Sequence, residues 1–225
     1  MLRLASYYTP SHADMFRRFV LPGASAFYET RILRCEQTCP TGSFKSPGWN
    51  ACMLDKLRAL MSLPMDGMPT LYVDADVVLL PGMHRWASLV GDSLGTQDVA
   101  FSDDAIQWCC GVMLFRCTPE VREFWNVVWH LANAWNIPDQ DVIHSLRSQA
   151  EQRRGFLPVQ PHILDPNVVC NWATVNAPTV PAPWDGEPIE VPESCMAWHA
   201  NFTVGVERKF AMLEAVAHGR QHCDD

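Results

Sequence analysis

The chain has 225 residues, 48% of them hydrophobic and 19% charged, and this length can bury a substantial core, so we expect one domain over residues 1–225. Its 25 acidic and 17 basic side chains give a formal net charge of −8, and no lysine- or arginine-rich run is present, which argues against a nucleic-acid partner. With no signal peptide and no stretch of about 18 apolar residues, we expect a soluble, cytoplasmic protein without a membrane-spanning segment.

The amino-terminal residues predict two strands separated by a short helix. Met1–Tyr8 is an apolar run that predicts a buried strand, and the turn Thr9-Pro10-Ser11 ends it. We expect Ser11 to cap a helix that runs through Phe19, and Ala26–Leu33 predicts a second strand. A loop over Cys35–Ser43 follows.

Nine cysteines are spread along the chain, and two of them lie in this loop. Their number is odd, and the C-x-x-C spacing that is typical of zinc sites is absent. We therefore expect reduced thiols, most of them in the core, as in a reducing compartment. A disulfide or a metal site at Cys35 and Cys39 is the less favoured alternative.

The middle of the chain predicts a helix and three further strands. Ser46 at the N-cap and Pro47 at the first helical position indicate a helix that continues to about Leu63. The first half of Thr70–Leu80 is rich in β-branched and aromatic residues and predicts a strand. Two shorter runs, Val99–Ser102 and Gly111–Arg116, are further strand candidates.

The second half of the chain predicts helices and strands in alternation. The helix that begins at Thr118-Pro119 has an expected buried stripe of Val121, Phe124, Trp125, Val128 and Leu131. We then expect a short helix over Asp139–Leu146, a surface loop over Pro178–Pro192, a strand over Ser194–His199 and a helix over Gly205–Ala217. This alternation predicts a three-layer α/β domain with a mainly parallel sheet, in which ligands bind beyond the carboxyl ends of the strands.

Two aspartates, Asp74 and Asp76, directly follow the predicted strand that begins at Thr70. Side chains two residues apart in extended chain point the same way, so both carboxylates can face one cation. Hard oxygen ligands suit Mg²⁺ or Mn²⁺, which usually keep coordination sites open for substrate phosphates. The alternative is a solvated turn after a strand, because two acids at this spacing are common by chance.

Four segments in chain order carry a family resemblance: Leu71–Val77, Cys110–Arg116, Pro138–Ile143, and Trp198–Gly205 followed by Lys209. The first resembles the D-x-D segment of GT-A fold glycosyltransferases, the nucleotide-diphospho-sugar transferases. The best match is to the retaining branch with glycogenin-like and bacterial galactosyltransferase-like enzymes. The others resemble the family's Asn-Ser-Gly strand, Asp-Gln-Asp helix start and His…Gly…Lys element. The resemblance implies a GT-A fold, a Rossmann-like three-layer sandwich with a mainly parallel central sheet.

The resemblance implies a metal site and a diphosphate site. Asp74 and Asp76 would hold the metal and contact the donor, and His199 would be the third protein ligand. An imidazole beside two carboxylates favours Mn²⁺, with Mg²⁺ as the alternative. Lys209 and the Gly205 backbone at a helix start would meet the diphosphate, although Lys209 is equally compatible with a solvated surface position. The other seven histidines are interpreted as structural or surface groups.

The resemblance also assigns residues to the base and the sugar of the donor. Tyr8 and Thr9 would flank the base, and Lys56 would reach the donor unless it is a surface lysine, which is the more ordinary interpretation. Asp139 would bind sugar hydroxyls and Gln140 would face the anomeric carbon. Asp139 or Asp141 could instead cap the helix that begins there.

The sequence departs from the family pattern at Cys109-Cys110, which replace Asn-Ser before the glycine. This departure puts the sugar and acceptor contacts of that strand in doubt, whereas Gly111 preserves a close approach of the backbone. Asp103-Asp104 either lines the sugar pocket or forms a plain acidic turn, and we favour the turn.

We therefore expect a metal-dependent transfer of a hexose from a nucleotide-diphosphate sugar, a UDP-sugar in the first place, with retention of stereochemistry. The acceptor would be a carbohydrate, a protein or a small molecule. One alternative is a phosphohydrolase of the haloacid dehalogenase type, with Asp74 as nucleophile and Asp103-Asp104 as metal ligands. Another is a catalytically silent module that binds a sugar nucleotide.

Overall fold

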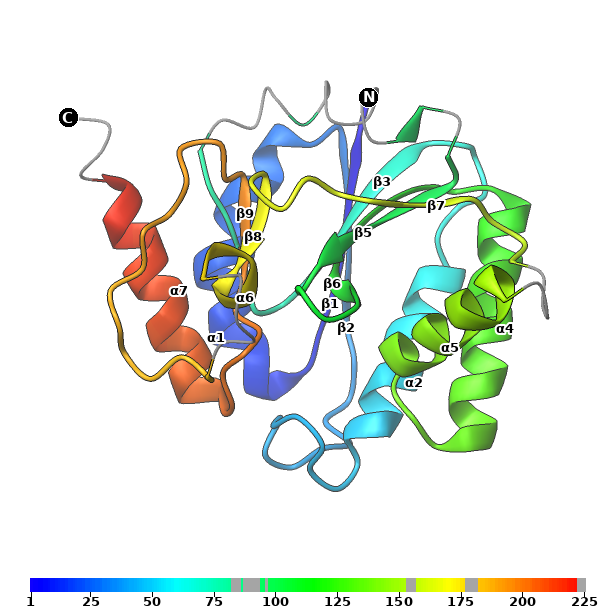
Figure 1. Ribbon diagram of the computed structural model, residues 1–225, viewed down its shortest axis with the longest axis horizontal. Helices are drawn as coiled ribbons and strands as arrows, with labels where there is room; N and C mark the ends of the chain where they lie inside the picture. The colour runs from blue at the N-terminus through cyan, green and yellow to red at the C-terminus, as the bar shows by residue number, and fades with distance from the viewer. Residues whose placement is uncertain (82–85, 87–93, 96, 153–156, 177–181, 222–225) are drawn as a thin grey trace.

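The computed structural model describes residues 1–81, 86, 94–95, 97–152, 157–176 and 182–221, and a six-stranded sheet forms its centre (Figure 1). Across the sheet the strands are β2 (Glu29–Arg34), β1 (Arg3–Tyr8), β3 (Pro69–Asp74), β6 (Trp108–Arg116), β5 (Val99–Asp103) and β7 (Pro161–Ile163). The pairs β1/β2, β1/β3 and β5/β7 are parallel, while β6 runs antiparallel to both of its neighbours. The expected α/β fold with a mainly parallel sheet is confirmed.

Both faces of the central sheet are buried, and successive side chains of β3 point to opposite faces. Leu71 and Val73 pack into a core cluster on one face, whereas Tyr72 packs into the cluster on the other face. This alternation follows from the two-residue period of an extended strand. Asp74, two residues after Tyr72, therefore lies at the end of the strand on the Tyr72 face.

Three helices cover the Tyr72 face: α2 (Trp49–Met61), α4 (Pro119–Trp135) and α5 (Asp139–Glu151), on the right in Figure 1. As predicted, α4 begins after Thr118, whose hydroxyl accepts a hydrogen bond from the Val121 amide. Its predicted stripe is buried except for Leu131, which is partly buried, and Ala132 completes the buried face. The helix α5 is longer than the predicted Asp139–Leu146.

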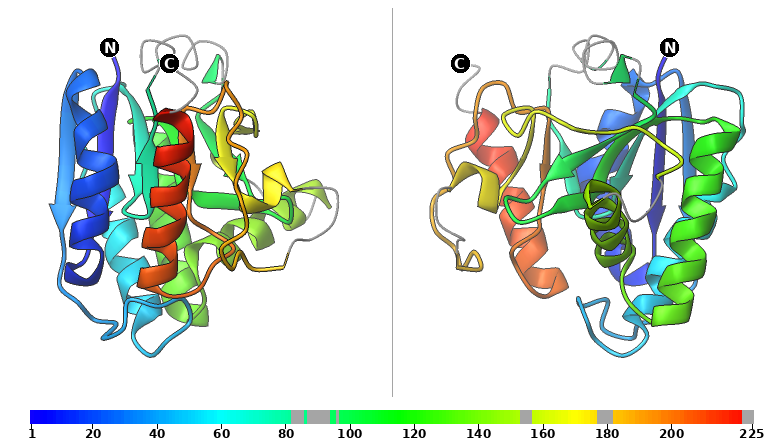
Figure 2. Two further views of the ribbon diagram at one scale, coloured as in Figure 1. Left: turned by 90° about the vertical axis from the view of Figure 1, so that its left-hand side faces the viewer. Right: turned by 45° about the vertical axis from the view of Figure 1, so that its right-hand side comes forward.

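The opposite face is covered by helical turns and by a second sheet (Figure 2). The turns are η1 (Pro10–His12), α1 (Ala13–Met15), η2 (Phe16–Val20) and η3 (Leu21–Ala26). The second sheet has the order β4 (Val77–Leu79), β9 (Ala197–His199) and β8 (Val169–Asn171), and it lies with α6 (Trp172–Val175) and α7 (Val206–Gln221). The described residues thus form the expected three layers, and β9 and α7 confirm the predicted strand and helix near the carboxyl terminus within a few residues.

Two predicted helix starts are wrong. The first helical turn begins at Pro10, with Thr9 rather than Ser11 in the N-cap position, because proline already has the φ angle of a first helical residue. The helical turns continue to Ala26, so β2 begins three residues later than predicted, at Glu29.

The other wrong start is that of α2, where Ser46 is not the N-cap. Gly48 occupies the N-cap position with a φ of 81°, and the helix begins at Trp49. The Ser46 hydroxyl instead donates to the Ser43 carbonyl at 2.7 Å and closes the preceding turn.

The predicted surface loop Pro178–Pro192 is partly described, since residues 178–181 lie outside the described residues. From 182 to 192 it contains no helix or strand. The buried ring of Trp184 anchors it by packing into a core cluster, and its Nε1 donates to the Glu187 carbonyl within the loop at 2.8 Å. In the amino-terminal loop, Cys35 and Cys39 are not joined by a disulfide, as expected. No helix in the described part of the chain combines the length and apolar character needed to cross a bilayer.

Candidate active site

A cavity of about 460 Å³ lies where β1 and β3 end, between the α2–α5 layer and the second sheet. Its walls come from residues that lie far apart in the sequence. Of the residues that the family resemblance assigns to the metal, the donor and the sugar, those that line it are Tyr8, Thr9, Lys56, Asp74, Asp76, Asp139, Gln140, His199 and Lys209. Gly205 is not among its lining residues, so the structure brings together all but one of the predicted site residues.

Asp74, Asp76 and His199 meet because of the pairing between β4 and β9. Val77, the residue after Asp76, lies opposite His199 in this antiparallel pair, and the Ala200 amide donates to the Asp76 carbonyl at 2.9 Å. The His199 Nε2 atom is 3.4 Å from Asp76 Oδ1. One possible ligand atom from each of the three residues lies within 4.8 Å of the others.

Two positive side chains compensate the charge of Asp76. The Lys209 ammonium donates to Asp76 Oδ2, and His199 faces Oδ1. Burial alone would raise the pKa of Asp76, but Lys209 and His199 hold the pKa well below its usual range. Burial alone would lower the pKa of His199, whereas the neighbouring Cys109 and Asp76 raise it to about 10. The pKa of Asp74 is raised by burial, even though the Lys56 ammonium is 3.6 Å away.

The three donors fit a divalent cation. Two carboxylates and one imidazole offer hard oxygen and borderline nitrogen ligands, a set that suits Mn²⁺ or Mg²⁺ in a site open to substrate. A Cβ built on Gly111 would overlap the His199 imidazole, so this glycine leaves room for the ring beside β6. The close approach predicted for Gly111 is therefore made to His199.

Lys56 is buried, and the surface interpretation of it is wrong. Its Nζ forms an ion pair with Asp139 Oδ2 at 2.8 Å and donates a hydrogen bond to the Cys110 carbonyl at 3.3 Å. Burial alone would lower the pKa of Lys56, but Asp139 and Asp74 raise it well above its usual value. Asp139 does not cap α5, because Pro138 stands at the N-cap without a side-chain bond. The Asp139 carboxylate instead forms an ion pair with Lys56, and the residue lines the cavity.

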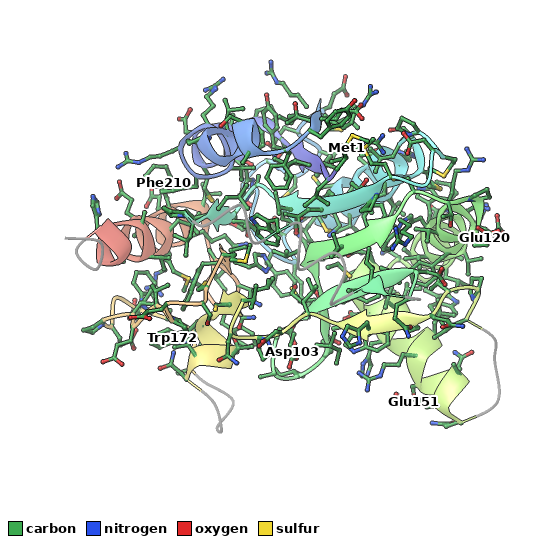
Figure 3. The ribbon with its side chains drawn as sticks, turned by 90° about the horizontal axis from the view of Figure 1, so that it is seen from above. Met1, Asp103, Glu120, Glu151, Trp172 and Phe210 are labelled. Atoms are coloured by element: carbon green, nitrogen blue, oxygen red, sulfur yellow. The ribbon has the colours of Figure 1, made fainter. Side chains whose placement is uncertain are left out.

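Gln140 is held from both ends of its amide. Its Nε2 donates to Asp104 Oδ2 at 2.8 Å, and its Oε1 accepts from the Cys110 amide at 3.4 Å. The other oxygen of Asp104 accepts from the amides of Ile106 and Gln107, which makes the predicted acidic turn. The interpretation as a turn is thus correct for Asp104, which in addition lines the cavity. Figure 3 shows this β5–β6 turn from above, with Asp103 labelled.

Tyr8 and Thr9 lie at the end of β1, on the rim of the cavity. The Tyr8 ring stacks on Phe16, with centroids 4.6 Å apart and planes 7° from parallel. Thr9 Oγ1 is 3.3 Å from Ser11 Oγ. Gly205 has a φ of 96° directly before α7, a conformation that side chains rarely adopt, so it sets the start of the helix that carries Lys209.

Two polar cavity residues, His12 and Asn201, were not singled out in the sequence. His12 lines the cavity near Thr9, and the Asn201 side-chain amide, which also lines it, has no hydrogen-bond partner among the described residues. Cys109, noted as a departure from the family pattern, has its Sγ 3.4 Å from His199 Nδ1. The interpretation of the remaining histidines as structural or surface groups is thus incomplete for His12, while His84 lies outside the described residues. Asn201 lies within the matched carboxyl-terminal segment, which was the one available signal.

Comparison with known proteins gives a family match. The family model described as nucleotide-diphospho-sugar transferase matches residues 33–213. No curated protein matches the chain by sequence. A solved glycosyltransferase involved in the glycosylation of the major capsid of PBCV-1 has a TM-score of 0.65 and 16% identity, with coverage of 95% of this chain and 98% of its own.

Two other solved structures have the same fold. The galactosyltransferase LgtC, solved with donor and acceptor sugar analogs, has a TM-score of 0.52 and 11% identity, with 96% of both chains covered. Mouse xyloside xylosyltransferase 1 has a TM-score of 0.50 and 9% identity, with coverage of 89% of this chain and 97% of its own. At these identities the likeness extends to the fold, which is that of GT-A transferases.

Proposed function

The chain belongs to the nucleotide-diphospho-sugar transferase family, and on this premise we propose that it transfers a hexose from a nucleotide-diphosphate sugar in a metal-dependent reaction. A UDP-sugar is the expected donor, and Mn²⁺ is the expected metal, with Mg²⁺ as the alternative. The observation that carries the proposal is the meeting of Asp74, Asp76 and His199, with Lys209 beside them, in one cavity. A metal bound by three such ligands and a nearby lysine would together stabilise the negative charge of a diphosphate leaving group.

The diphosphate end of the donor is assigned to the Asp76 side of the cavity. Asp74, Asp76 and His199 would hold a divalent cation, whose positive charge would stabilise a departing diphosphate. Lys209 lies 18% exposed at the start of α7, where its ammonium can turn from Asp76 to a phosphate oxygen. Tyr8 and Thr9, at the end of β1, are assigned to the nucleoside.

The transferred sugar is assigned to Asp139 and Gln140 on the first turn of α5. The ion pair with Lys56 fixes the position of the Asp139 carboxylate, so its oxygens can accept hydrogen bonds from sugar hydroxyls. The hydrogen bond that Gln140 donates to Asp104 and the one that it accepts from the Cys110 amide fix the Gln140 side chain in the same way. We propose retention, with the acceptor attacking on the leaving-group face and Gln140 beside the anomeric carbon.

The acceptor is assigned to the apolar mouth of the same cavity. Phe44, Ile106 and Val204 line it and are each about half exposed, at 48%, 57% and 57%. Phe44 packs edge-on against Trp49, with centroids 4.8 Å apart. Exposed apolar side chains that gather at one opening mark a binding surface, and aromatic rings of this kind can pack on the C–H face of a carbohydrate acceptor.

The phosphohydrolase alternative loses its support. It needs Asp103 and Asp104 as metal ligands, whereas both carboxylates accept amide hydrogens of their own turn and neither joins the ligand cluster among the described residues. The silent binding module keeps one supporting feature, the Cys109-Cys110 pair at the family's Asn-Ser positions. Release of UDP from a UDP-sugar distinguishes the transferase from this module.

The test is thermal unfolding with UDP, with and without Mn²⁺, for the wild type and for Asp76→Ala and His199→Ala. A ligand at about 100 times its dissociation constant stabilises the folded state by roughly 2.7 kcal/mol. We expect a Mn²⁺-dependent rise in Tm that both variants lose. Asp14→Ala and His218→Ala change exposed residues of the same types and should keep it. No rise with any nucleoside diphosphate would contradict the proposal, and a panel of UDP-sugars then identifies the donor by UDP release.

A further inference from the structure

Cys109 stands directly behind the candidate metal ligand His199. Its Sγ is 3.4 Å from His199 Nδ1, and both side chains are buried. Within the described residues, the cluster of candidate metal ligands contains Asp74, Asp76 and His199 but not Cys109. The sulfur therefore contacts the imidazole from the side away from the carboxylates.

The two nitrogens of His199 face different partners. Nε2 faces the Asp76 carboxylate at 3.4 Å, whereas Nδ1 faces the Cys109 sulfur. A metal-binding imidazole offers the lone pair of one nitrogen and carries a hydrogen on the other, which a neighbouring acceptor orients. With Nε2 toward the cation position, the hydrogen must be on Nδ1, and Cys109 is the group that can accept it.

Two contacts hold the sulfur and the ring in this arrangement. The Gly111 amide lies 3.5 Å from the Cys109 sulfur and donates to it, so the sulfur already acts as an acceptor on one side. The ring also lies directly against the Gly111 backbone, in the place that a Cβ on this residue would fill. The imidazole thus lies between the β6 backbone and the sulfur, with little room to rotate.

We propose that Cys109 is a positioning residue that fixes His199 by accepting its Nδ1 hydrogen, so that Nε2 points to the cation between Asp74 and Asp76. The inference rests on the proposed metal-dependent function. It gives the residue at this departure from the family pattern a role in the metal site instead of in sugar binding. Cys109 itself does not touch the substrate or the metal.

The test compares Mn²⁺ affinity in variants that keep or remove the acceptor. Cys109→Ser keeps an acceptor, whereas Cys109→Ala and Cys109→Val remove it; valine also fills the space and suits a strand. The control Cys110→Ala removes the adjacent buried thiol, which packs on the opposite face of β6. The dissociation constant for Mn²⁺ is measured with UDP present, from the electron paramagnetic resonance signal of free Mn²⁺. Tm without metal reports the stability of each variant separately.

We expect Cys109→Ala and Cys109→Val to weaken Mn²⁺ binding about tenfold or more, as loss of a partner behind a metal ligand does. Cys109→Ser should stay near the wild type, and Cys110→Ala should lower Tm without changing the affinity. Unchanged Mn²⁺ affinity in Cys109→Ala and Cys109→Val would overturn the inference, as would an equal loss of affinity in Cys109→Ser. Either result would leave the proposed metal site itself intact. A wild type that binds no Mn²⁺ would overturn both the inference and the proposed function.

Discussion

Lys56 and Asp139 form a buried ion pair at the floor of the cavity, with Nζ 2.8 Å from Oδ2 and side-chain exposures of 3% and 4%. The two residues come from different helices, α2 and α5, and the Lys56 ammonium also donates to the Cys110 carbonyl on β6. The pair therefore ties two helices of one layer to the central sheet, next to the Asp74 carboxylate.

Removal of Lys56 should destabilise the protein strongly. Lys56→Met leaves the Asp139 carboxylate buried without its partner, and such a loss costs about 3–5 kcal/mol. Because an apolar pair avoids this cost, Lys56→Met with Asp139→Leu should recover most of the free energy of unfolding. Guanidinium chloride unfolding measures all three proteins. Arg58→Met, at an exposed pair on the same helix, should change stability by less than about 0.5 kcal/mol. Equal losses at Lys56 and Arg58 would contradict the prediction.

The longer elements of the fold could be predicted from the sequence because each has a period of its own. The strand that ends at Asp74 and the buried apolar stripe of α4 were both predicted, because the spacing of their apolar residues is visible in the local sequence. The strands β7 and β8 are three residues long and α6 has four residues, so no period is available to identify them. Their conformation is set by pairing with β5 and β9, which the local sequence does not contain.

The site could be predicted only where a residue type and a motif coincide. Asp74, Asp76 and His199 have the chemistry and the matching segments, and the structure places them together. The depth of Lys56 depends on Asp139, 83 positions along the chain, so helical spacing alone gave a surface position. Cys109 was marked in the sequence only as a departure from the family pattern, because its contact with His199, 90 positions along the chain, depends on how the strands β6 and β9 are placed in the fold.

The Arg3–Asp66 pair, at the amino-terminal end of β1 and away from the cavity, predicts a pH dependence of stability. The hydrogen bond from the buried Arg3 guanidinium lowers the pKa of Asp66 below its ordinary value of 3.8. A lowered folded-state pKa adds stability above the unfolded pKa and loses it as the pH falls through the folded pKa. Asp66→Asn should therefore be less stable than the wild type at pH 7, and the difference should shrink below about pH 4.

Urea unfolding at pH 7 and near pH 3 measures this difference. The control Asp14→Asn changes an exposed aspartate that pairs with Arg17 three residues away, and it should shift stability by less than about 0.5 kcal/mol at pH 7. A difference between Asp66→Asn and the wild type that is the same at both pH values would contradict the role of this carboxylate charge.

Lys209→Met should affect metal and nucleotide binding in opposite directions. In the structure Lys209 donates to Asp76, so a cation there has to share that carboxylate with an ammonium group. Removal of one nearby charge should tighten Mn²⁺ binding about fivefold, from roughly 1 kcal/mol of repulsion. UDP binding should weaken by about 10- to 100-fold, because a charged hydrogen bond to phosphate is lost.

Titration calorimetry with Mn²⁺ alone, and with UDP at saturating Mn²⁺, separates the two effects. Arg208→Met is the matched control, since Arg208 is the preceding residue of α7 and pairs with Asp185 on the surface. It should leave both constants near those of the wild type. If Lys209→Met weakened both ligands together, the variant would have disturbed the site as a whole, and the assignment of Lys209 to the diphosphate would be wrong.

Gly111→Ala should weaken metal binding at the proposed site without unfolding the protein. The added methyl group overlaps the His199 imidazole, so the ring must move away from Asp76. Overpacking of this kind costs about 1–3 kcal/mol, and we expect a loss of Mn²⁺ affinity of about tenfold or more when the ligand is displaced. Gly219→Ala places its methyl group on α7, where none of the described residues lies within 4 Å of it, and should stabilise the helix by roughly 0.5–1 kcal/mol. Guanidinium unfolding and Mn²⁺ titration of the two variants test the prediction. Wild-type Mn²⁺ affinity in Gly111→Ala would mean that His199 does not bind the metal from its position above β6.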